Sequence, residues 1–225
     1  QANNTNEIFS VNTNFCSSIL GAVKKNGLDK KTKIMIVGSA AEYGLISEKN
    51  LPISEDFLGT PFTDYGKSKL KQTKIAIEWQ KKIKQLVVIR PFNIIGSNML
   101  KHLAVGSFQN QIDSIKNTGE LQTGNLDVQR DFVDVDDVID LMFTLINKDE
   151  SYGEIINICK SKPILLREIV NSMIRTSGKN IKIKEVSKRI RKDDVPIHYG
   201  CNAKLLSIVG DYKFKGIDET IINLV

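Results

Sequence analysis

Ser39, Tyr65 and Lys69 are residue types that together can move a proton to or from a carbonyl or alcohol oxygen. Tyr65 and Lys69 are four positions apart, so on a helix they share one face. A free tyrosine has a pKa of about 10, and a nearby ammonium group lowers it towards working pH. Tyr65 could then donate or accept a proton. Ser39 could hold the same oxygen as charge develops on it.

The segments around these residues predict a strand, a loop and a helix. Lys33–Val37 is a short apolar run with β-branched residues, which is typical of a buried parallel strand. Ser39 follows it, at the edge where open α/β sheets bind ligands. Residues 50–61 contain two prolines and a glycine and predict a loop. Thr63 or Asp64 can cap the helix that follows.

The rest of the chain alternates helical and strand patterns, without repeats or low-complexity linkers. This alternation predicts an α/β fold built on a parallel sheet. Further strands are expected at Leu86–Arg90, Ile155–Cys159 and Ile181–Val186, and further helices at Gly106–Lys116, Val135–Asn147, Leu165–Ser177, Asn202–Ile208 and Ile217–Leu224.

Five segments in a fixed order point to a known family. They are 10–23, which suits a helix before the catalytic strand, Gly38-Ser39-Ala40-Ala41-Glu42-Tyr43-Gly44, Arg90-Pro91-Phe92-Asn93-Ile94-Ile95-Gly96, 124–135 with Arg130-Asp131-Phe132-Val133-Asp134-Val135, and 191–200. Together with Tyr65-x-x-x-Lys69 they resemble the extended short-chain dehydrogenase/reductases that act on nucleotide sugars, also called the NAD-dependent epimerase/dehydratase family. The likeness is to its GDP-4-keto-6-deoxy-D-mannose reductase and GDP-mannose 4,6-dehydratase group.

The resemblance implies the C-terminal part of a Rossmann-like doubly wound parallel sheet plus a smaller substrate-binding lobe. Residues 1–97 and 129–159 would belong to the sheet domain, and 98–128 and 160–225 to the nucleotide-sugar lobe. NADP or NAD would be the cofactor. The implied roles are catalysis by Ser39, Tyr65 and Lys69, cofactor binding by Tyr65, Lys69, Phe92 and Asn93, and substrate binding by Asn93, Arg130, Arg191 and Asp194.

Purely structural roles are the alternative to several of these assignments. Ser39 could only cap the end of a strand, and Asn93 could only satisfy a loop backbone. Arg130 could pair with Asp131 or Asp134, although the planar guanidinium also suits a diphosphate.

A strand followed by a glycine-rich turn that opens a helix, the fingerprint that holds a dinucleotide pyrophosphate, is not recognisable in the sequence. In the family this fingerprint lies near the N-terminus. The expectation is therefore that the chain is the C-terminal two-thirds of a longer protein. A naturally shortened relative is the alternative.

The position before Glu42 bears on the reaction. Relatives that dehydrate the sugar carry a glutamate where this chain has Ala41. If the segment is extended, the shift of the acid to Glu42 points the carboxylate the opposite way. The leading hypothesis is therefore the reduction of a GDP-linked, or other nucleotide-linked, 4-keto-6-deoxy sugar with NAD(P)H. The alternatives are a 4-epimerase or 4,6-dehydratase of the same fold, or a non-catalytic remnant that serves as a binding module.

Composition fits a globular enzyme. The chain has 225 residues, of which 41% are hydrophobic and 26% charged, and a net charge of +6 that mildly favours anionic ligands. It has no apolar run of the roughly 20 residues that a membrane span needs, and its helix lysines lack the interleaved aromatic residues of nucleic-acid binders.

Cys16, Cys159 and Cys201 share no metal or redox spacing, and His102 and His198 are isolated. We expect a cytoplasmic protein without metal that forms a homodimer when complete.

Overall fold

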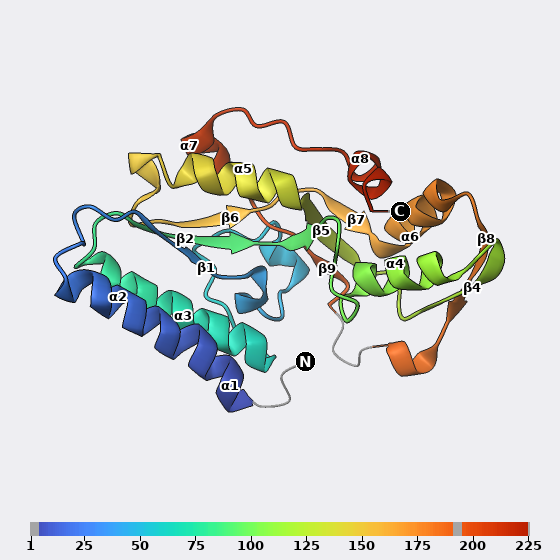
Figure 1. The fold of residues 1–225 in the computed structure, drawn as a ribbon, viewed down its shortest axis with the longest axis horizontal. Coiled ribbons are helices and arrows are strands. Elements are labelled where there is room, and N and C mark those ends of the chain that lie inside the picture. Colours follow the sequence, from blue (N-terminus) through green and yellow to red (C-terminus); the bar gives the residue numbers. More distant parts are fainter. Residues whose placement is uncertain (1–4, 191–194, 225) are drawn as a thin grey trace.

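The computed structural model describes residues 5–190 and 195–224. At its centre lies a parallel sheet in the order β1-β2-β6, with β1 at Ile34–Val37, β2 at Leu86–Pro91 and β6 at Ile155–Ile158 (Figure 1). The register pairs Val37 with Ile89 and Pro91 with Ile158. These are three of the predicted strands, so the parallel α/β sheet is confirmed.

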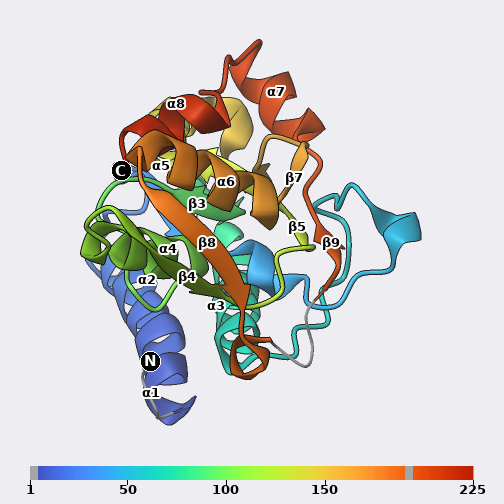
Figure 2. The ribbon, with the colours of Figure 1, turned by 90° about the vertical axis from the view of Figure 1, so that its right-hand side faces the viewer.

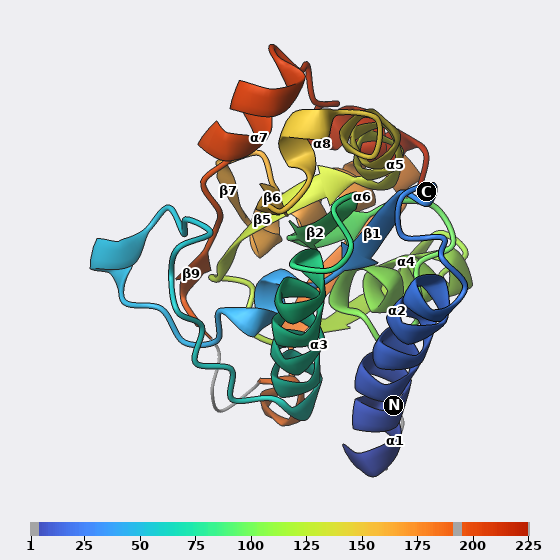
Figure 3. The same cartoon turned by 90° about the vertical axis from the view of Figure 1, so that its left-hand side faces the viewer.

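Helices cover both faces of this sheet (Figures 1 and 3). On one face α2 (Phe15–Lys25) and α3 (Asp64–Gln80) pack against the strands through a cluster that contains Cys16, Leu20, Ala76 and Ile83. On the other face lie α5 (Val135–Leu145) and α7 (Ala203–Val209). The α2 helix continues a helical stretch made of α1 (Thr5–Phe9) and a π-helical turn at Ser10–Asn14.

A second group of elements lies beyond the carboxyl ends of the central strands (Figures 1 and 2). β5 (Gln129–Asp134) pairs with β3 (Asn93–Ile95), β7 (Pro163–Leu165) and β9 (Ile197–His198). β4 (Thr118–Thr123) pairs with β8 (Asn180–Glu185). These strands pack with α4 (Ala104–Ser114), α6 (Leu166–Ser177) and α8 (Ile217–Ile222) around one apolar cluster. The division into a sheet domain and a lobe stays a prediction, and β5, which it assigns to the sheet domain, pairs with β3, β7 and β9.

Five strands were not expected from the sequence: β3, β4, β5, β7 and β9. β4 shows why, because only Leu121 and Thr123 of its six residues are buried, and its polar residues resemble a loop. Short 3₁₀ turns complete the described structure at Ala40–Glu42, Glu48–Asn50, Asp149–Ser151 and Ser187–Arg189. No helix in the described ranges combines the length and apolar character of a membrane span.

Candidate active site

Ser39 lies directly beyond the carboxyl end of β1, where it begins the 3₁₀ turn Ala40–Glu42. Its Oγ accepts a hydrogen bond from the backbone N–H of Ala41 at 3.2 Å, so the side chain does cap this turn. The bond uses the oxygen only as an acceptor, and the hydroxyl group can still donate. Capping and substrate binding are therefore compatible roles for Ser39.

Tyr65 and Lys69 lie in the first turns of α3, whose start is fixed by Thr63. The Thr63 hydroxyl accepts from the Gly66 N–H at 3.0 Å, as the cap prediction required. The Tyr65 side chain is 47% exposed. The expected place of Tyr65 at the start of a helix is confirmed, and the structure adds that the residue is exposed there.

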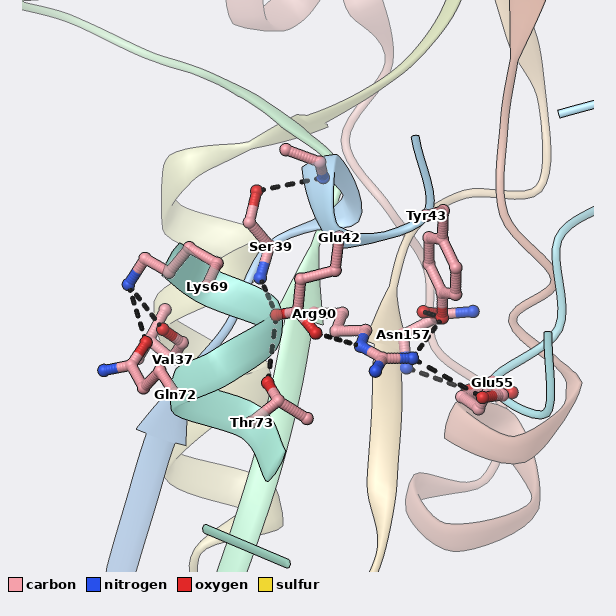
Figure 4. A network of polar contacts seen from close by, with 11 residues as sticks. Val37, Ser39, Glu42, Tyr43, Glu55, Lys69, Gln72, Thr73, Arg90 and Asn157 are labelled. Atoms are coloured by element: carbon pink, nitrogen blue, oxygen red, sulfur yellow. Dashed lines mark hydrogen bonds and ion pairs between the residues drawn. The ribbon is translucent and has the colours of Figure 1, made fainter. Parts of the chain in front are cut away.

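Lys69 reaches towards the end of β1. Its Nζ donates to the carbonyl oxygen of Val37 at 2.9 Å and to Oε1 of Gln72 at 3.0 Å (Figure 4). Partial burial lowers the pKa of Lys69, and the carboxylate of Glu42 opposes this shift. Among the described residues, no hydrogen bond joins Lys69 to Tyr65. An effect of Lys69 on Tyr65 stays a prediction.

Glu42 is buried beside Ser39 and holds the turn in place. Its Oε1 accepts from the Ser39 backbone N–H at 2.9 Å and from the Thr73 hydroxyl at 3.0 Å. Its Oε2 accepts from Arg90 Nε at 2.9 Å, in an ion pair whose side chains are 0% and 6% exposed (Figure 4). The expectation of an extended chain at Glu42 is wrong, because residues 40–42 form a helical turn. The carboxylate points inwards because Thr73 and Arg90 bind it there.

Tyr43 belongs to the same buried network but is unsuited to proton transfer. Its hydroxyl donates to Asn157 Oδ1 at 2.6 Å and accepts from Arg90 at 3.1 Å. Burial raises the pKa of Tyr43 to about 12, so it stays protonated at neutral pH. Tyr43 is therefore excluded as a proton donor at neutral pH, and the role of Tyr65 stays a prediction.

A cavity of about 590 Å³ opens between the carboxyl ends of the central strands and the second group of elements. Four of the expected site residues line it: Tyr65, Phe92, Asn93 and Arg130. The cavity wall does not include Ser39, at the turn after β1, or Lys69, one turn along α3 from Tyr65. Arg191 and Asp194 fall outside the described residues. The remaining lining residues are Ile94, Met99, His102, Leu103, Ala104, Val105, Ser107, Phe108, Gly124, Asn125, Val128, Phe132, Leu166 and Arg189.

The polar groups of this cavity suit an anionic ligand. Arg130 contributes positive charge from the start of β5, and Arg189 contributes it from the 3₁₀ turn Ser187–Arg189. His198 lies behind Phe92 with the ring centres 5.5 Å apart. Burial and the charge of Arg130 lower the pKa of His198 to about 4, so the imidazole is neutral at pH 7. Two guanidinium groups in one cavity can bind the two phosphates of a diphosphate.

Sequence patterns identified only part of this cavity. Asn93 lines it while its Nδ2 donates to the carbonyl oxygen of Asp131 at 3.0 Å, so the amide also satisfies a backbone group. The apolar wall from α4, which includes Ala104, Val105 and Phe108, carries no local motif. Its contribution depends on how α4 packs against distant elements, which the sequence pattern does not reveal.

The comparisons with known proteins agree with this fold. Residues 1–159 match the family model described as NAD dependent epimerase/dehydratase family. The chain is 27% identical over 197 residues to GDP-6-deoxy-D-mannose reductase of Pseudomonas aeruginosa, and the matched region covers 86% of this chain and 64% of that relative. It is 29% identical over 220 residues to GDP-6-deoxy-D-talose 4-dehydrogenase of Aggregatibacter actinomycetemcomitans, and the matched region covers 96% of this chain and 71% of that relative.

A solved structure shows the same architecture. The structure of RMD from Pseudomonas aeruginosa, complexed with NADPH, superposes with a TM-score of 0.85 at 24% identity, over 96% of this chain and 72% of that chain. At this level of identity the likeness shows the fold. The chain belongs to the NAD dependent epimerase/dehydratase family.

Proposed function

We propose that the protein reduces a nucleotide-linked 4-keto-6-deoxy sugar, with GDP as the favoured nucleotide. The observation that carries the proposal is the exposed Tyr65 in the wall of a cavity that also holds Arg130 and Arg189. A proton donor and a diphosphate-binding pair in one cavity match a nucleotide sugar. Two relatives named for GDP-6-deoxy-sugar oxidoreduction support the same substrate class.

NADP or NAD is the proposed cofactor, and the described residues fit its nicotinamide end. An ammonium group has three donors, of which Lys69 uses two for Val37 and Gln72. The third can bind a ribose hydroxyl, beside Tyr65 and the Phe92–Asn93 segment that follows β2. When bound, the reduced nicotinamide supplies the hydride. The protein contributes position and electrostatics.

In this proposal Tyr65 donates a proton to the keto oxygen as the carbonyl is reduced. Ser39 steadies the same oxygen with its hydroxyl group, and Lys69 keeps positive charge close to the helix start. Arg130 and Arg189 bind the diphosphate, and Asn93 contributes an amide at the cavity wall. Arg191 and Asp194 are proposed to complete the nucleotide site.

The Ser39 turn favours reduction over dehydration. A dehydratase needs an acid–base group at the sugar's C5 and C6, and the position expected for it is Ala41. The neighbouring Glu42 is buried in an ion pair with Arg90 and bound by Ser39 and Thr73, so it is held away from the substrate.

We also propose a cytoplasmic homodimer. An apolar stripe on the first helical stretch supports self-association, since Val11, Phe15 and Ile19 are exposed and lie four residues apart. Analytical ultracentrifugation of the native protein tests this proposal. A dimer that dissociates in a Phe15→Glu variant would support it, and a monomer at micromolar concentration would refute it.

The reaction is tested by two assays on the full-length native protein. The first supplies GDP-mannose with the oxidised cofactor, and the second supplies the GDP-linked 4-keto-6-deoxy sugar with NADPH or NADH. A reductase oxidises the cofactor only in the second assay. Formation of a keto sugar in the first assay would instead identify a dehydratase. Inversion of GDP-mannose at C4 in the first assay, without net change of the cofactor, would identify an epimerase. Inactivity in both assays would favour a binding module.

A further inference from the structure

Glu42 joins the Ser39 turn to the helix that carries Tyr65 and Lys69. A single oxygen, Oε1, accepts both the Ser39 backbone N–H at 2.9 Å and the Thr73 hydroxyl at 3.0 Å (Figure 4). The two donors come from elements that are far apart in sequence. The position of this oxygen therefore sets the position of the Ser39 turn relative to α3.

Thr73 lies on the same face of α3 as Tyr65 and Lys69. It lies four residues after Lys69 and eight after Tyr65, so all three side chains follow one side of α3. Thr73 is buried, whereas Tyr65 at the helix start is exposed. The hydrogen bond to Glu42 thus fixes this face of the helix at Thr73. Because the helix is rigid, the bond also restricts the position of Tyr65.

Glu42 itself is held from two further directions. Arg90 on the central strand β2 binds Oε2 at 2.9 Å, and the pair is excluded from water. On the opposite side, Gly38 leaves room for the carboxylate. A methyl group at Gly38 would collide with Glu42 Oε1 and would lie 3.1 Å from the carbonyl oxygen of Ile89 and 3.2 Å from Thr73 Oγ1.

We propose that Glu42 is a positioning residue that sets the separation between Ser39 and Tyr65. The proposal rests on the proposed function, since it gives those two side chains a common substrate oxygen. Two groups that act on one oxygen must be held to a fraction of an ångström, and a misplacement of about 1 Å can cost on the order of 100-fold in rate. Glu42 acts through Ser39 and Thr73 and does not reach the cavity wall.

A buried carboxylate beside the site could also be only a stability element. Substitution of Glu42 or Arg90 leaves an unpaired buried charge and can prevent folding, so neither is the first test. Thr73→Val removes one hydrogen bond to Oε1 and keeps the side-chain shape. Thr73→Ser restores the hydroxyl group. Thr123→Val is the matched control, because Thr123 is also buried and its hydroxyl has no hydrogen-bond partner among the described residues.

The three variants and the wild type are compared in steady-state reduction of the GDP-linked keto sugar. For Thr73→Val we expect kcat to fall about 10-fold with the KM for the sugar within about twofold. Thr73→Ser should recover most of the rate, and Thr123→Val should match the wild type. A Thr73→Val enzyme with wild-type kcat, or with an effect on KM alone, would overturn the proposal.

A crystallographic readout separates this proposal from the proposed function. The distance between Ser39 Oγ and Tyr65 Oη should differ between wild type and Thr73→Val, and it should return to the wild-type value in Thr73→Ser. If the wild type reduces no keto sugar, the proposed function fails and this distance alone decides the role of Glu42. An unchanged distance would overturn the positioning role.

Discussion

Lys69 Nζ donates a hydrogen bond to the carbonyl oxygen of Val37 at 2.9 Å. The bond ties the helix that carries Tyr65 to the last residue of β1, just before the Ser39 turn. Both sides of the candidate site are thus joined twice, by Lys69 at the helix start and by the contact of Glu42 with Thr73 further along it. Lys69, expected to act on Tyr65 and to bind the cofactor, also has a structural role.

Replacement of the Tyr65 hydroxyl should remove the proton donor without disturbing the fold. We expect Tyr65→Phe to lower kcat by about 100-fold or more, which is the usual scale for general acid–base groups. The KM for the nucleotide sugar should change little, because the ring remains in the cavity wall. The matched control is Tyr152→Phe, since the Tyr152 hydroxyl donates to the Ile146 carbonyl oxygen, and neither residue lines the cavity. Equal rates for Tyr65→Phe and wild type would remove Tyr65 from the mechanism.

Loss of the Lys69 ammonium group should affect both cofactor binding and turnover. Lys69→Met keeps the aliphatic chain and removes all three donors, including the one proposed for ribose. We expect kcat to fall by about 10-fold or more and the KM for the reduced cofactor to rise. Lys74→Met, on an exposed position of the same helix, is the control. If both lysine variants behave alike, Lys69 has no role beyond that of a surface cation.

The central sheet could be predicted because each of its strands is a short and mainly apolar segment. β2 shows this most clearly, since all six residues from Leu86 to Pro91 are buried. The position of Ser39 followed from the same pattern, as a residue just beyond a strand, although β1 is less buried than expected, since only Ile34 of its four residues is buried. Thr63 could be identified as a cap because the side chain and the helix start are local in sequence.

The parts that could not be predicted depend on contacts between distant segments. The inward direction of Glu42 is set by Thr73 and Arg90, which lie 31 and 48 residues away in the chain. The cavity wall from α4 and the pairing of β4 with β8 likewise require the folded chain. The expectation at Glu42 took the segment to be extended, whereas Ser39 and Glu42 cap a 3₁₀ turn whose carboxylate is held by Thr73 and Arg90.

The two arginines of the cavity should contribute to substrate binding more than to chemistry. For Arg130→Met or Arg189→Met we expect the KM for the nucleotide sugar to rise about 10-fold or more, since hydrogen bonds to charged groups contribute roughly 1.5–3 kcal/mol each. The effect on kcat should be smaller. Arg175→Met is the control, because Arg175 forms an exposed ion pair with Asp218. An unchanged KM in both cavity variants would place the diphosphate elsewhere.

Asp131 should make the stability of the protein depend on pH. It lies in β5 with 0% exposure, and its Oδ1 accepts from the Lys160 N–H at 2.9 Å. Its Oδ2 has no hydrogen-bond partner among the described residues. Burial raises the pKa of Asp131 from 3.8 to about 6, although the Lys160 N–H partly opposes the shift. Between these two pH values the folded state therefore binds more protons than the unfolded state.

The sign of the effect follows from this difference in protonation. The contribution of Asp131 to the free energy of unfolding should be largest below pH 4 and should decrease as the pH rises to about 6, by up to about 3 kcal/mol. Asp131→Asn does not titrate, so its stability relative to wild type should improve by up to that amount between pH 4 and pH 7. His198, with its pKa lowered to about 4, acts in the opposite direction, but it is present in both proteins and cancels in the difference. Urea denaturation at several pH values measures the effect, with Asp113→Asn at an exposed position of α4 as the control. A constant difference between Asp131→Asn and wild type from pH 4 to pH 7 would show that Asp131 is already ionised in the folded protein at the acidic end of this range.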